Sequence, residues 1–199
     1  MQTSSAPRRE IEHAKVAIAR MRSADSLLEF DEHWKHYLHR VERAWNKTKA
    51  HFGKSPKWGN WAAKYEKERT QDPLLSYLCN ARGADEHTTT EVTSQHPGGI
   101  GIGLADGVGV QPDGSIFIEK LTINTSPGKL EITSAQPLKL TFHAAQVRME
   151  PVVNRGRHYQ VPTAHAGAAI DSNDLPAVAE LAIAYYESAV SRAEEFFIK

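Results

Sequence analysis

The sequence predicts an α+β protein with an N-terminal helical bundle, an antiparallel β-meander module and a closing C-terminal helix. Apolar residues recur at helical spacing over residues 8–91, alternate with polar residues or glycine after Pro97, and return to helical spacing after Asp174. Turn signals separate the alternating runs at intervals typical of short antiparallel strands. Helices and strands are therefore segregated along the chain, as they are in α+β folds.

The first part of the chain is expected to be helical after a disordered start at residues 1–7. Helices are predicted over residues 8–22, 26–52, 59–69 and 73–91. The second has the clearest apolar stripe, while Asp72 and Pro73 should begin the fourth as its N-cap and first residue. We expect the stripe of the second helix to line the helical core with Trp34, Leu38, Val41 and Trp45.

The β module is expected to form an antiparallel sheet between residues 98 and 162, with turns at residues 112–114, 126–128 and 154–156. The last helix is predicted over residues 174–198, with an apolar face made of Val178, Leu181, Tyr185, Ala189 and Phe196. The predicted organisation is a disordered start at 1–7, a helical part at 8–96, a β module at 97–170 and a C-terminal helix at 171–199 that packs on the helical part.

Composition indicates a soluble cytoplasmic protein with no membrane partner. The 199 residues include 24 Lys and Arg and 24 Asp and Glu, so the formal net charge is zero and a broadly basic nucleic-acid surface is not expected. The single cysteine, Cys79, cannot form an internal disulfide, which fits a reducing compartment. No apolar run reaches the length of a membrane span. No cofactor is expected. No metal site is expected either, because the three closely spaced histidines, His33, His36 and His39, fall on the polar face of their helix.

The segment with the clearest chemistry is residues 82–87, RGADEH, in the fourth predicted helix. Arg82 and His87 are about 140° apart on a straight helix, so they converge on one ligand only if the helix distorts at Gly83 or a second subunit completes the site. In the structural alternative, His87 lies on the surface and Arg82 pairs with an acidic neighbour, Asp85 or Glu86. Supporting roles in a site are assigned to Asn80, Asp85 and His165.

This segment resembles the HEPN family of nucleotide-related helical domains. The family signature is an Arg, usually followed by a polar residue, and then a His four to six residues further on, within a late helix of a bundle. Arg82 and His87 match this signature, and Gly83 stands where the polar residue usually stands. The resemblance implies metal-independent RNA cleavage by paired subunits, with His87 as a general acid or base and Arg82 as the clamp on the scissile phosphate.

Basic residues in two other segments are candidate RNA contacts. One group surrounds the end of the second helix beside two tryptophans, and the other lies in the last predicted hairpin. The alternatives are cations that favour a helix C-terminus and hairpin residues that face water. The candidates are Lys47, Lys49, Lys54, Lys57, Arg155 and Arg157.

Two functions follow as hypotheses. The first is a homodimeric, metal-independent endoribonuclease of HEPN type, of a kind used in bacterial defence or toxin systems. The second is a non-catalytic structural or interaction module that binds a protein partner, in which Arg82 and His87 are structural. The two hypotheses differ in geometry, because catalysis requires that both side chains face the same groove.

Overall fold

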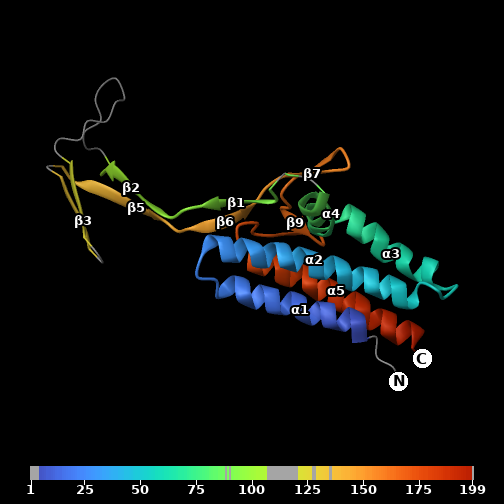
Figure 1. The fold of residues 1–199 in the computed structure, drawn as a ribbon. Helices are drawn as coiled ribbons and strands as arrows, with labels where there is room; N and C mark the ends of the chain where they lie inside the picture. Colours follow the sequence, from blue (N-terminus) through green and yellow to red (C-terminus); the bar gives the residue numbers. More distant parts are fainter. Residues whose placement is uncertain are drawn as a thin grey trace. The chain divides into compact units, whose positions relative to one another are not determined.

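The computed structural model describes residues 5–87, 89, 91–106, 121–126, 129–134 and 136–198. Within these residues it confirms the α+β class, with helices first, antiparallel strand pairs next and a helix last (Figure 1). The helices are α1 (Ser5–Arg22), α2 (Leu27–Phe52), α3 (Trp58–Gln71), α4 (Pro73–His87) and α5 (Leu175–Phe197). Residues 5–7 belong to α1, so the prediction of a disordered start was wrong there, and residues 1–4 lie outside the described residues.

Short polar side chains fix where the helices begin. The Ser26 hydroxyl accepts a hydrogen bond from the Glu29 amide at 3.1 Å, and the Asp174 carboxylate accepts one from the Ala177 amide at 3.0 Å. The predicted cap Asp72 likewise accepts from the Leu75 amide at 3.0 Å. Each cap satisfies a backbone N–H that has no partner within its helix. The fourth helix ends at His87, before the predicted residue 91.

Helices α1, α2 and α5 pack side by side around the main core (Figure 1). The predicted stripe of α2 is buried as expected: Trp34, Leu38, Val41 and Trp45. The predicted face of α5 was wrong at two positions, because Leu181 is 43% exposed and Phe196 is 48% exposed. Small residues fill that interface instead, including Ala179, Ala182, Ala189 and Ala193. Alanine lets two helix backbones approach closely, while Leu181 and Phe196 point outward.

The strands form antiparallel pairs in a nested order. Strand β1 (Thr93–His96) pairs with β6 (Gln146–Met149), β2 (Gly99–Leu104) with β5 (Leu138–His143), and β3 (Leu121–Ser126) with β4 (Lys129–Ser134). Two local hairpins follow, β7 (Val152–Asn154) with β8 (Arg157–Tyr159), and β9 (Ala164–His165) with β10 (Ala168–Ala169). A meander would pair only successive strands, whereas β1 and β2 pair with strands much later in the chain. The predicted turns at 112–114 and 126–128 lie wholly or mostly outside the described residues.

The chain divides into two compact units. Unit 1 comprises Met1–His96 and Gln146–Lys199, and unit 2 comprises Pro97–Ala145. The strands β1 and β6 to β10 therefore belong with the helices, and the predicted β module of 97–170 contains residues of both units. In unit 2, one face of the β2–β5 pair carries only apolar side chains: Ile100, Ile102, Leu104, Leu138, Leu140 and Phe142. None of the described helices combines the length and apolarity needed to cross a bilayer.

Candidate functional site

Helix α4 positions the candidate site within unit 1. It contacts α2 and α3 on one side and strands β7, β8 and β9 on another. Its apolar residues Leu74, Leu78 and Ala81 are buried in the core, while Asn80 and Arg82 lie toward the β7–β8 hairpin. A cavity of about 500 Å³ lies there, which we call the Arg82 cavity. Its lining residues are Glu42, Cys79, Asn80, Arg82, Gly83, His87, Asn154, Arg155, Arg157 and Tyr159.

Arg82 and His87 both line the Arg82 cavity. Helix α4 continues through Gly83 without a break, so their convergence comes from the reach of the Arg82 side chain and the place of His87 at the helix end. The His87 side chain is 70% exposed and that of Arg82 is 28% exposed. Arg82 Nη2 pairs with Glu86 Oε1 at 2.6 Å, which is one of the contacts expected of a structural Arg82. Its Nε is buried and has no hydrogen-bond partner among the described residues.

Asp85 points to helix α2 and not to Arg82. Its Oδ2 lies 3.2 Å from His39 Nε2, while His39 Nδ1 lies 3.2 Å from Glu86 Oε1. One imidazole therefore bridges two consecutive carboxylates of α4. Glu86 Oε2 also lies 3.7 Å from His87 Nε2, so Glu86 contacts both candidate catalytic side chains. Asp85 fixes α4 against α2, and Glu86 is the residue that holds Arg82 in this structure.

Gly83 permits a close approach between α4 and the β7–β8 hairpin. A Cβ at this position would lie 2.6 Å from Asn154 Nδ2 and 3.1 Å from Asn154 Cγ. Asn80 Nδ2 donates to the Ser76 carbonyl at 2.8 Å, so Asn80 Oδ1 faces Asn154 and accepts from its Nδ2 at 3.0 Å. This chain of amides fixes the orientation of both asparagines. Asn154 thereby places a polar group directly beside the residue that follows Arg82.

The turn of the hairpin presents two arginines to the cavity. Arg155 and Gly156 connect β7 to β8 with φ values of 50° and 74°. Two consecutive positive φ angles match the tight turn that suits the twist of a two-residue hairpin. Neither Arg155 nor Arg157 forms an ion pair with another described residue. Glu42, the acidic residue of the cavity wall, is paired with Arg69. The cavity is therefore electropositive.

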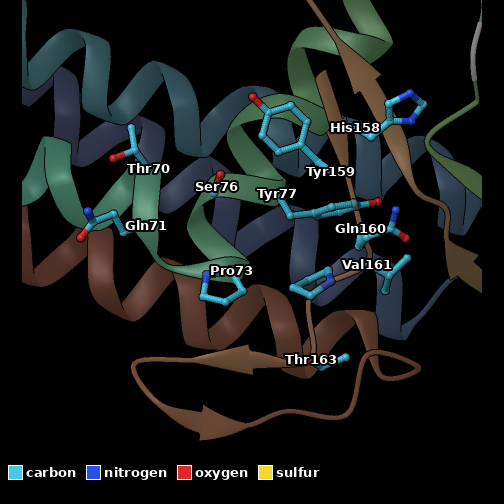
Figure 2. A pocket seen from close by; sticks show the side chains of 11 residues that line it. Thr70, Gln71, Pro73, Ser76, Tyr77, His158, Tyr159, Gln160, Val161 and Thr163 are labelled. Atoms are coloured by element: carbon cyan, nitrogen blue, oxygen red, sulfur yellow. The ribbon is translucent and has the colours of Figure 1, made fainter. Parts of the chain in front are cut away.

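Two further cavities adjoin the Arg82 cavity. The Lys49 cavity, of about 630 Å³, shares the walls Cys79, Asn80, Arg157 and Tyr159 with it. The Tyr77 cavity, of about 330 Å³, shares Tyr159 with both and lies between the end of α3 and the chain that follows β8. Figure 2 shows it with Thr70 and Gln71 on one side, Tyr159, Gln160 and Val161 on the other, and Ser76 and Tyr77 between them. The three cavities together follow one side of α4.

The lysines predicted to contact RNA do not lie together in the structure. Lys49 lines the Lys49 cavity, whereas Lys54 and Lys57 line none of the three. Lys47 pairs with Glu10, which also pairs with Arg40 at 2.9 Å. Burial alone would raise the pKa of Glu10, but the hydrogen bonds from Lys47 and Arg40 outweigh it and lower this pKa to about 2. The charge of Lys47 is therefore neutralised by Glu10 within the helical bundle.

His165 also lies outside the three cavities. Its Nδ1 is 3.0 Å from Asp72 Oδ1, and the Ala166 amide donates to Asp72 Oδ2 at 2.7 Å. Burial opposes ionisation of Asp72, but these hydrogen bonds lower its pKa. The N-cap of α4 therefore fastens the β9–β10 hairpin, and His165 acts there as a structural contact.

Four cavity residues were not predicted from the sequence: Glu42, Cys79, Asn154 and Tyr159. A glycine inside a helical pattern is a signal of close backbone approach, and it could have indicated that a partner such as Asn154 packs on Gly83. Burial raises the pKa of the Cys79 thiol, so this cysteine is not activated as a nucleophile. Tyr159 gave no sequence signal beyond its strand pattern.

In the part of the chain that the structure describes, no group of three or more His, Cys, Asp or Glu side chains is arranged to hold a metal ion. Comparison of the chain with models of protein families, with curated proteins and with solved structures gave no match. The geometry of the Arg82 cavity is therefore the feature of the chain that bears on function.

Proposed function

We propose that this protein is a metal-independent endoribonuclease of HEPN type. The observation that supports the proposal most is that Arg82, His87 and Asn80 of α4 line one electropositive cavity together with Arg155 and Arg157 of the β7–β8 hairpin. Catalysis of phosphodiester cleavage needs a proton-transfer group and a phosphate clamp in reach of the same atom. An interaction surface has no such requirement.

The chemistry would be a transfer within the RNA strand. The 2′-oxygen attacks the adjacent phosphorus, and the bond from phosphorus to the 5′-oxygen breaks. The 2′-hydroxyl loses its proton, and the leaving 5′-oxygen gains one. His87 would carry one of these two proton transfers. Arg82 would stabilise the charge that develops on the phosphate through its planar fork. A second subunit would supply the other proton-transfer group, as the paired sites of the resembling family imply.

Arg82 is suited to exchange its carboxylate partner for a phosphate. Its Nη2 is held by Glu86, but its Nε has no hydrogen-bond partner among the described residues. A buried donor without a partner costs free energy, and a rotation of the side chain that carries Nε to a phosphate oxygen would remove that cost. The two uncompensated arginines of the hairpin would offset the repulsion between the phosphate and Glu86.

The test is cleavage of mixed RNA by the purified protein in EDTA. We expect cleavage to persist in the chelator and to fall roughly 10²–10⁴-fold in His87→Ala, which removes the proton transfer. Arg82→Ala should fall comparably, with both variants still folded by circular dichroism. Arg8 and His13 of α1 have the same spacing but Arg8 pairs with Glu194 at 2.6 Å, so His13→Ala is a matched control and should cleave like the parent. Cleavage that requires a metal, or that survives His87→Ala unchanged, would contradict the proposal.

The second candidate is a non-catalytic interaction module. The exposed apolar side chains of unit 2 favour it, since Phe142 is 72% exposed on the apolar face of the β2–β5 pair. The Arg82–Glu86 ion pair would then be an ordinary helix contact. This function predicts no RNA cleavage and no effect of His87→Ala on any RNA-dependent measurement.

A further inference from the structure

The Lys49 cavity adjoins the proposed catalytic cavity and has chemistry of its own. Asn80, Arg157 and Tyr159 line both, so the two cavities are direct neighbours along α4. At about 630 Å³ the Lys49 cavity exceeds the Arg82 cavity, at about 500 Å³. Each is within the range that encloses small ligands.

Cations dominate the Lys49 cavity. Lys49 and Arg157 line it, and neither forms an ion pair with a described residue. Arg69 also lines it, but Glu42 neutralises that charge and the guanidinium stacks on Trp45 with 5.0 Å to the ring centroid. Glu66 is the carboxylate of the lining that has no cationic partner among the described residues. Two uncompensated cations against one anion leave a net attraction for a phosphate group.

The same cavity carries groups that suit a nucleobase. Tyr159 is half-buried and packs on the core, so its ring is held in one place. Aromatic rings of this kind stack on the face of any base. The side-chain amide of Asn46 also lines the cavity, and an amide forms paired hydrogen bonds with a base edge. The combination of cations, a fixed ring and an amide matches a nucleotide more closely than a simple anion.

We propose that the Lys49 cavity is a nucleotide-binding subsite, in which Lys49 and Arg157 hold the phosphate and Tyr159 stacks on the base. Its role as the place of the nucleotide next to the scissile phosphate rests on the proposed ribonuclease function. The shared chemistry, a base with a phosphate, is also that of a free mononucleotide. Binding of the two kinds of ligand can be measured separately from cleavage.

The experiment measures nucleotide binding by calorimetry in a His87→Ala background, so that no ligand is consumed. The probes are a dinucleotide with a 2′-deoxyribose at its 5′ residue, which cannot be cleaved by the 2′-oxygen, and the four nucleoside 5′-monophosphates. Lys49→Met keeps the apolar stem and removes the charge, and should weaken binding roughly tenfold. Tyr159→Leu should weaken it roughly 5- to 100-fold through loss of stacking. Lys54→Met is the matched control, because Lys54 lines none of the three cavities.

Each outcome separates the two proposals. Loss of binding in Lys49→Met and Tyr159→Leu, but not in Lys54→Met, supports the subsite. Tighter binding of the dinucleotide than of the monophosphates assigns it to the flanking nucleotide, and equal binding assigns it to a free nucleotide. RNA cleavage by the parent together with unchanged affinities in both variants overturns the subsite and leaves the ribonuclease proposal standing. If nucleotide binding depends on Lys49 but the parent protein cleaves no RNA, the ribonuclease proposal is overturned and the subsite stands.

Discussion

Glu10 shows how single residues set the stability of the helical unit. Its side chain is only 2% exposed, yet it is surrounded by cations of α2: Lys47, Arg40 and, at 3.7 Å, Arg43. A buried carboxylate is costly unless it is paired and hydrogen-bonded. The pairing prevails here, because the pKa of Glu10 is lowered from 4.5 to about 2. The carboxylate therefore joins α1 to α2 only while it is ionised.

We expect Glu10→Gln to lower the free energy of unfolding at pH 7 by about 3 kcal/mol. Because the pKa in the folded state lies below the value in the unfolded state, the contribution of Glu10 is complete above about pH 4.5 and is lost as the pH falls toward 2. Urea unfolding at several pH values should show the gap between parent and variant closing over that interval. Glu12→Gln on the same helix is the control, since Glu12 is 66% exposed. A gap that stays constant with pH would show that Glu10 is not the titrating group.

Gly83 can be tested through its contact with Asn154. Gly83→Ala places a methyl group 2.6 Å from Asn154 Nδ2, so we expect a loss of about 1–3 kcal/mol in the free energy of unfolding. In an Asn154→Ala background the clash is absent and only the higher helix propensity of alanine remains, which favours the variant by up to about 1 kcal/mol. A double-mutant cycle from chemical denaturation measures this coupling. Gly59→Ala is the control, because nothing lies within 4 Å of its added methyl group, and equal effects of Gly83→Ala in both backgrounds would disprove the contact.

At the scale of elements, the β7–β8 hairpin combines a strained turn with a charge. Arg155 adopts a φ of 50°, a conformation that disfavours most residues with a side chain but is tolerated by asparagine. We expect Arg155→Asn to raise the free energy of unfolding by about 0.5–1 kcal/mol while weakening RNA binding at low salt. Ala166 occupies the same place in the β9–β10 turn with a φ of 49°, so Ala166→Asn should stabilise similarly without affecting RNA. Thermal unfolding and RNA titration check both effects, and unchanged RNA affinity in Arg155→Asn would remove Arg155 from the binding surface.

The helices could be predicted from the sequence because their signals are local. The stripe from Trp34 to Trp45 and the caps at Asp72 and Asp174 each depend on residues within a few turns. The pairing of the strands could not be predicted, since β1 and β6 are brought together by contacts far apart in the chain and alternation alone does not say which strand pairs with which. The inward face of α5 was missed at Leu181 because alanines, which give a weak hydropathy signal, form the interface.

The candidate site was predictable only in part for the same reason. Arg82 and His87 share one helix, so their spacing was visible in the sequence. That Arg155 and Arg157 join them, while His165 binds Asp72, depends on how two hairpins fold back onto α4. Helical spacing also could not decide between the acidic neighbours of Arg82. In the structure Arg82 pairs with Glu86, and His39 of α2 contacts both Asp85 and Glu86.

At the scale of the whole molecule, the functional chemistry proposed here is confined to unit 1. All three cavities are lined by residues of Met1–His96 and Gln146–Lys199. Unit 2, Pro97–Ala145, is inserted between two residues that already pair with each other, because His96 lies opposite Gln146 in the β1–β6 ladder. The two parts of unit 1 are therefore joined at the insertion point by the β1–β6 pairing itself.

We therefore expect unit 1 to fold after residues 97–145 are replaced by Asn-Gly. This dipeptide favours the two-residue turn that would join β1 to β6 directly, and the core residues of the helices lie outside the removed segment. Circular dichroism should show retained helix and a cooperative thermal transition, and the shortened chain should bind the uncleavable dinucleotide like the full chain. Replacement of residues 154–157 by the same dipeptide is the contrasting variant, because it shortens the β7–β8 hairpin by one residue pair and removes Asn154, Arg155 and Arg157. It should fold less stably and lose that binding. If the chain without residues 97–145 fails to fold, unit 2 is required for the helical core.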